Sequence, residues 1–126
     1  MTVAVILASA RSAGNTRTLV DMCFAAGVSI EDLARLHVAG YAYDDRHAED
    51  DFLPLIRRLL AADVWLLATP LYWYTVSAQA KAFIDRLTDL ITVAKPLGRQ
   101  LRGRALGVLC TGTDSAPPPL SMSRCA

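Results

Sequence analysis

Residues 6–16 read Ile-Leu-Ala-Ser-Ala-Arg-Ser-Ala-Gly-Asn-Thr, and they join an apolar run to a helical pattern. The apolar run, Thr2–Ala8, is typical of a central parallel strand that is buried on both faces. A helix is predicted over Asn15–Ala26, because apolar side chains recur there at helical spacing: Leu19, Val20, Cys23 and Ala26. A strand that passes through a short polar loop into a helix indicates a βαβ unit, and hence a parallel α/β sheet.

The rest of the chain continues this alternation of strands and helices. Further strands are predicted at Leu33–Val38, Asp63–Thr69 and Ala105–Cys110, and helices at Glu49–Ala62 and Ser77–Ile91. The pattern predicts a three-layer α/β sandwich: a parallel sheet of four recognisable strands with helices on both faces. In such sheets ligands bind beyond the carboxyl ends of the strands. The loops at that edge are residues 9–15, 39–48, 70–76 and 111–115.

Size and composition narrow the function classes. A chain of 126 residues predicts a single domain, and its 13 basic and 12 acidic side chains argue against a nucleic-acid surface. No run approaches the roughly 20 apolar residues that a membrane-spanning helix needs, and no signal peptide is recognisable. The cysteines are few and widely spaced, so neither a disulfide framework nor a metal site is predicted: Cys23, Cys110 and Cys125. A reduced, cytoplasmic setting is the simplest interpretation.

The loop after the first strand predicts a phosphate site. Helix N-termini present unpaired N–H groups and a partial positive charge, and hydroxyls with an arginine add donors around an anion. The alternative is an ordinary turn with a helix cap, which asparagine and threonine also favour. Neither a Gly-Lys-Ser/Thr ending nor a Gly-x-Gly-x-x-Gly motif is present, so a phosphomonoester on a small ligand is favoured. The candidate residues are Ser9, Arg11, Ser12, Gly14, Asn15 and Thr16.

Two further loops predict a flat ligand. Tyr72, Trp73 and Tyr74 follow the Asp63–Thr69 strand, and three adjacent aromatic side chains there favour contact with a planar ring or with another subunit. Packing at an interface is the alternative to ligand binding. Thr111–Ser115 follows the last predicted strand, where Gly112 permits close approach of the backbone to a ring. An ordinary turn explains this segment equally well.

The remaining polar residues have simpler interpretations. His37 is expected to be structural in the 33–38 strand, and His47 to be a solvated loop residue. The carboxylates between the second strand and second helix are read as a solvated loop and helix start rather than as a magnesium site: Asp44, Asp45, Glu49, Asp50 and Asp51. Arg99, Arg102 and Arg104 suit a 2′-phosphate, although such a basic connector is more often solvated.

Two motifs together resemble a known family. These are Ser-x-Arg-x-x-Gly-Asn-Thr at residues 9–16 and Thr-Pro-Leu-Tyr-Trp-Tyr-x-x-Ser-Ala-Gln-x-Lys-x-Phe-Ile-Asp-Arg at residues 69–86. They resemble the flavodoxin-like NAD(P)H-dependent FMN reductases, a group that includes quinone and azo reductases. The resemblance covers residues 1–113 as one FMN-binding domain and implies strand order 2-1-3-4-5. The Pro-rich tail, residues 114–126, is expected to be irregular, with the family's last helix and fifth strand missing.

The resemblance implies roles for residues of all three loops. Ser9, Arg11, Gly14, Asn15 and Thr16 would hold the FMN phosphate. The second loop would line the ribityl chain and the isoalloxazine ring, and the third would approach the ring's other side: Pro70, Leu71, Tyr72 and Trp73, then Thr111, Gly112 and Thr113. Tyr74 and Tyr43 are candidate substrate contacts.

The activity that follows is an FMN-dependent NAD(P)H oxidoreductase that passes electrons to a quinone, azo compound, flavin or metal ion. No side chain need act as acid or base, because the flavin carries the chemistry. A homodimer or higher homo-oligomer is expected, since the rim aromatics and the open edge of the last strand both need cover. The alternatives are an FMN-binding electron carrier without NAD(P)H turnover, and a shortened remnant that has lost FMN.

Overall fold

The computed structural model describes residues 1–126 apart from residues 25, 113–121 and 125–126. Parallel strands form the centre of a twisted sheet, in the order β2-β1-β3-β5. Their bounds are β1 Val3–Leu7, β2 Ser29–Asp32, β3 Val64–Tyr72 and β5 Ala105–Thr111. This arrangement confirms the predicted flavodoxin-like strand order.

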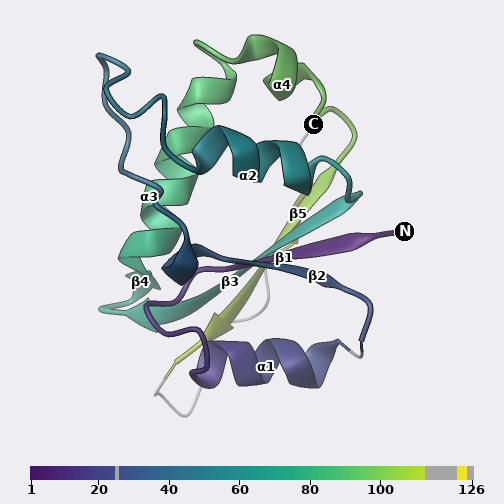
Figure 1. Ribbon diagram of the computed structural model, residues 1–126. Coiled ribbons are helices and arrows are strands. Elements are labelled where there is room, and N and C mark those ends of the chain that lie inside the picture. The colour runs from purple at the N-terminus through teal and green to yellow at the C-terminus, as the bar shows by residue number, and fades with distance from the viewer. Residues whose placement is uncertain (25, 113–121, 125–126) are drawn as a thin grey trace.

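Helices cover both faces of this sheet (Figure 1). Helix α1 (Asn15–Cys23) lies on one face, and α2 (Phe52–Leu59) and α3 (Ala78–Arg86) lie on the other. Short helical turns complete the second layer: η1 (Leu33–Arg35), η2 (Leu87–Leu90) and α4 (Lys95–Arg99). In the described part of the chain no helix is long and apolar enough to span a membrane.

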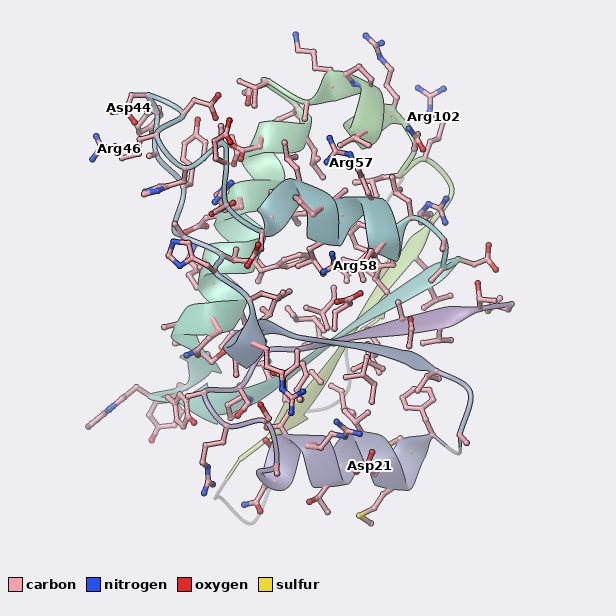
Figure 2. The ribbon with its side chains drawn as sticks, viewed as in Figure 1. Asp21, Asp44, Arg46, Arg57, Arg58 and Arg102 are labelled. Carbon is pink, nitrogen blue, oxygen red and sulfur yellow. The ribbon has the colours of Figure 1, made fainter. Side chains whose placement is uncertain are left out.

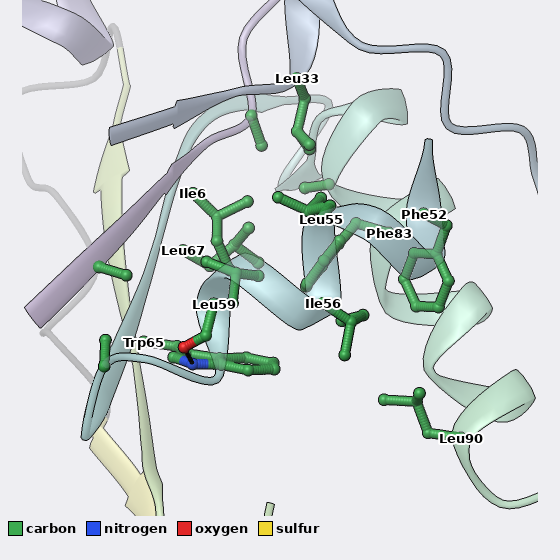
Figure 3. Packing of buried hydrophobic residues seen from close by; sticks show 14 residues of the cluster. Ile6, Leu33, Phe52, Leu55, Ile56, Leu59, Trp65, Leu67, Phe83 and Leu90 are labelled. Atoms are coloured by element: carbon green, nitrogen blue, oxygen red, sulfur yellow. Dashed lines mark hydrogen bonds between the residues drawn. The ribbon is translucent and has the colours of Figure 1, made fainter. Parts of the chain in front are cut away.

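The side chains of β1 alternate between two cores because successive residues of a strand point to opposite faces. Ala4, Ile6 and Ala8 pack with α2 and α3, whereas Val5 and Leu7 pack with Val20 of α1. Figure 3 shows the first core, in which the Phe52 and Phe83 rings meet edge to face with centroids 5.8 Å apart. A strand that is buried on both faces explains the continuous apolar run in the sequence.

Two sequence-based predictions are wrong in detail. The second strand is Ser29–Asp32 and not Leu33–Val38; Asp32 caps the turn η1 instead, accepting the Ala34 N–H at 3.0 Å. The tail is not wholly irregular either, because β6 (Met122–Arg124) pairs antiparallel with β5. The first part of β5 is therefore covered by the chain itself rather than lying at an open edge.

Candidate cofactor site

The loop between β1 and α1 brings several hydrogen-bond donors together. Gly14 occupies the N-cap position of α1, and no described side chain caps this end of the helix. The Arg11 guanidinium lies beside Gly14, since a Cβ built on the glycine would be 3.5 Å from Arg11 Nε and Nη2. Ser9 is buried, and its Oγ accepts the Arg11 N–H at 3.3 Å while its own proton remains available to donate. Among described residues Arg11 forms no ion pair, so backbone amides, a hydroxyl and a cation share this end of the helix.

The aromatic segment forms a hairpin at the same edge of the sheet. Strand β3 continues to Tyr72, three residues beyond the predicted Thr69, and returns in β4 (Thr75–Val76). Trp73 and Tyr74 form the two-residue turn with φ of 52° and 66°, the geometry of a type I′ turn. Such turns favour Asn and Gly, and large side chains adopt positive φ at a cost. Both aromatic side chains are nevertheless held in the solvent, 94% and 93% exposed.

Hydrogen bonds and close packing join the three predicted ligand segments. The hydroxyls of Thr16 and Thr111 are 2.9 Å apart, which connects the first turn of α1 to the end of β5. Ser77 Oγ donates to the Ala8 carbonyl at 2.6 Å and accepts the Ala80 N–H at 3.1 Å, so it caps α3 and ties it to β1. A Cβ on Gly112 would lie 3.9 Å from Leu71. The loop after β1, the β3–β4 hairpin and the end of β5 thus meet at one edge, as predicted.

A buried arginine that the sequence analysis did not select stabilises the neighbouring 39–50 segment. Arg86 of α3 is 2% exposed, and its guanidinium binds both carboxylate oxygens of Asp50, at 2.5 and 3.0 Å. It also binds Asp89 at 2.8 Å and the carbonyls of Ala39 and His47. The guanidinium carbon lies 4.8 Å from the centre of the Phe52 ring. One side chain therefore fixes both ends of the segment to α3.

The ionisation of this cluster follows from its hydrogen bonds. Burial by itself would raise the pKa of Asp50, but hydrogen bonds from Arg86 and from the Ala39 and Phe52 N–H groups bring that pKa below its usual value. Burial would likewise lower the pKa of Arg86, whereas its bonds to Asp50 and Asp89 raise it. Both groups are therefore charged at neutral pH, and the interpretation of Asp50 as a solvated loop residue is wrong.

Other polar predictions also need correction. His37 is not in a strand; its N–H donates to the Asp51 carboxylate at 2.6 Å, so Asp51 is not simply solvated. Asp44 pairs with Arg46, whose hydrogen bonds lower the Asp44 pKa to about 2. Figure 2 shows this pair at the tip of the 39–50 segment. Within the described residues no three metal-ligating side chains converge.

One predicted site residue, Tyr43, stands apart from the three joined segments. Tyr43 is 97% exposed on the 39–50 segment, where its ring meets Tyr41 edge to face at 5.2 Å. Among the described residues no aromatic pair or backbone hydrogen bond joins it to the phosphate loop or the hairpin. Thr113, also predicted as a site residue, lies outside the described residues.

The sequence did contain a signal for Arg86. It is a charged residue among the apolar positions of the 77–91 helix, and a lone charge on a buried face of a helix must be paired.

The fold and this site define a flavodoxin-like α/β protein with a donor-rich loop beside an aromatic hairpin. The chain belongs to the NADPH-dependent FMN reductase family, whose model matches residues 1–117. It is 34% identical over 102 residues to YwqN of Bacillus subtilis, assigned as an NAD(P)H-dependent FMN-containing oxidoreductase. That match covers 72% of this chain and 54% of YwqN.

Solved structures share the fold. The Trp repressor binding protein of Bacillus subtilis superposes with a TM-score of 0.69 at 25% identity, over 90% of this chain and 64% of that one. An NADPH-quinone reductase from P. pentosaceus has a TM-score of 0.64 at 20% identity, over 91% of this chain and 62% of that one, a likeness of fold alone. The chain thus spans about half the length of the curated relative YwqN.

Proposed function

We propose that this chain binds FMN at the joined segments and acts as an NAD(P)H-dependent FMN oxidoreductase. The observation that supports it most directly is the contact between the Thr16 and Thr111 hydroxyls, 2.9 Å apart, which unites a donor-rich helix N-terminus with a second strand end. YwqN is described as an NAD(P)H-dependent FMN-containing oxidoreductase, and membership in the NADPH-dependent FMN reductase family supports the same assignment.

The residues present fit a phosphorylated flavin. The uncapped N-terminus of α1, the Ser9 hydroxyl and the Arg11 guanidinium would hold the dianionic phosphate. Pro70, Leu71 and Tyr72 continue from that cradle along β3 and would line the rest of the cofactor, with Trp73 and Tyr74 at the rim. Bound FMN would supply hydride acceptance and electron delivery; the protein's part is to bind, orient and shield it.

The electron acceptor is proposed only by class, as a planar small molecule such as a quinone. Such a molecule suits a shallow site whose rim consists of exposed aromatic rings. We also propose that a second copy of the chain covers part of this rim, because rings that are more than nine-tenths exposed leave a large apolar surface in water.

The assay that tests this function has two stages. The purified chain is mixed with FMN, passed over a sizing column and examined for retained yellow colour, and then given NADH or NADPH with menadione. Retention followed by nicotinamide oxidation that depends on menadione is expected. Retention without nicotinamide oxidation, but with photoreduction of the flavin, would identify an electron carrier instead. A colourless protein would contradict the assignment.

The aromatic turn offers a prediction that separates stability from binding. Replacing it with the sequence typical of type I′ turns, Trp73→Asn with Tyr74→Gly, should leave the protein equally stable or more stable by about 1 kcal/mol. FMN affinity should fall, because the rim loses its rings. Urea unfolding and flavin fluorescence quenching measure the two effects. A variant that binds FMN as tightly as the parent would remove the hairpin from the site.

A further inference from the structure

A surface pocket of about 360 Å³ lies between η2 and α4, at the other end of the sheet from the proposed FMN site. Helix α4 leads into the start of β5, where the Ala105 N–H donates to the Asp63 carbonyl and Arg104 donates to the Ala62 carbonyl. Residues 62 and 63 immediately precede β3, so this is the edge at which the parallel strands begin (Figure 1). The proposed FMN site is at the edge where they end.

The walls of this pocket are set by close backbone packing. A Cβ on Gly98 would collide with the carbonyl oxygen of Leu90, so only glycine lets α4 lie directly against η2. The Leu90 side chain is buried, while Ile91 beside it is 72% exposed at the pocket wall. Leu101 completes an apolar lining that the chain leaves partly in contact with water.

Of the described residues that line this pocket, three are cations and none is a carboxylate: Lys95, Arg99 and Arg102. Among the described residues none of the three forms an ion pair, whereas Arg17, Arg58 and Arg86 each bind a carboxylate. Figure 2 shows Arg102 at the end of the molecule where α4 meets the start of β5. Like charges gathered around one pocket repel each other, and an anion placed between them relieves that repulsion.

We propose that this pocket binds an amphipathic anion, meaning a carboxylate or phosphate carried on an apolar body. The charged group lies among Lys95, Arg99 and Arg102, and the apolar part covers Ile91. The location argues against the alternative that these arginines receive the 2′-phosphate of a nicotinamide nucleotide bound at the proposed FMN site, because the two lie at opposite ends of the parallel strands. The proposal does not depend on flavin binding.

The experiment is a calorimetric titration of the flavin-free full chain with octanoate, and with acetate and octan-1-ol as its charged and apolar halves. Octanoate should bind more tightly than either, and added salt should weaken it because the cations are exposed. The variant R99Q/R102Q should bind octanoate about tenfold more weakly or worse, since it loses two charged partners. The variant I91S should weaken octanoate and leave acetate unaffected.

Two control variants assign the binding to this pocket. R35Q/R46Q removes the same charge from arginines outside the pocket and should bind octanoate like the parent, as should S9A/R11Q, which alters only the phosphate loop. Circular dichroism verifies that each variant is folded. Two results would overturn the proposal: octanoate binding no more tightly than acetate and octan-1-ol, or R35Q/R46Q lowering the octanoate affinity as much as R99Q/R102Q does. Residues 95–102 would then be a solvated basic connector.

Discussion

Replacing Arg86 with methionine is expected to lower the free energy of unfolding by about 3–5 kcal/mol. The variant leaves Asp50 and Asp89 buried beside each other without a cation, and it removes the donors that hold the Ala39 and His47 carbonyls. Methionine fills a similar volume against the Phe52 ring, so the loss reports the charges and not a cavity. Urea unfolding at pH 7, followed by circular dichroism, measures it.

The matched control is Lys81→Met on the same helix. Lys81 pairs with Asp85 at 2.7 Å, but both side chains are largely exposed, so the loss should be under about 1 kcal/mol. Asp50→Asn should also destabilise, and the double variant with Arg86→Met should lose less than the sum of the two single variants because the residues share one interaction. Similar losses in Arg86→Met and Lys81→Met would contradict the assignment of Arg86 as the anchor of the 39–50 segment.

The difference in stability between the parent and Arg86→Met should depend on pH, and its sign follows from the pKa of Asp50. The pKa of Asp50 is lower in the folded protein than its unfolded value of about 3.9. Between those two values the unfolded chain binds more protons, so the stabilisation is complete above about pH 4 and is lost as the pH falls through the folded-state pKa. The gap in stability between the parent and Arg86→Met should therefore be constant near neutrality and should narrow in acid.

The second large effect concerns the proposed phosphate cradle. Ser9→Ala combined with Arg11→Gln should weaken FMN binding by about 100-fold, since each lost bond to a charged group contributes roughly 1.5 kcal/mol or more. Riboflavin, which lacks the phosphate, should bind parent and variant alike. Fluorescence titration of both flavins measures the two affinities, and their ratio isolates the phosphate from the ring.

Arg17→Gln is the control for the loss of charge in this region. Arg17 lies on α1, and its side chain is already paired with Asp21 at 3.0 Å, so the ratio of FMN to riboflavin affinity should change little. A parent protein that binds FMN and riboflavin equally well would show that the loop holds no phosphate. An unchanged ratio in Ser9→Ala/Arg11→Gln would assign the phosphate to other residues.

Local patterns in the sequence were sufficient for the framework and for the edge of the sheet at which the candidate loops meet. Thr2–Ala8 and residues 63–69 are apolar without interruption, and such runs have few solutions other than strands buried between helices. Because the carboxyl ends of parallel strands share one edge, the motifs at residues 9–16, 69–77 and 111–112 had to approach one another once the strand order was set. Ser77, which caps α3, has a local signature of the same kind, because a serine directly precedes the apolar helical stripe.

Tertiary structure decided the features whose partners are distant in sequence. Asp50 looks like its solvated neighbours until Arg86, 36 residues away, binds it, and no local pattern distinguishes one carboxylate in a polar loop from the next. Trp and Tyr are not residue types that predict a type I′ turn, yet pairing of Leu71 with Val76 imposes positive φ on both Trp73 and Tyr74. The second strand ends at Asp32 because its parallel pairing with β1 ends there, opposite Leu7. Hydrophobic periodicity in the sequence predicts which residues are buried. Which buried charges pair with each other depends on contacts between distant segments, and only the folded structure shows these.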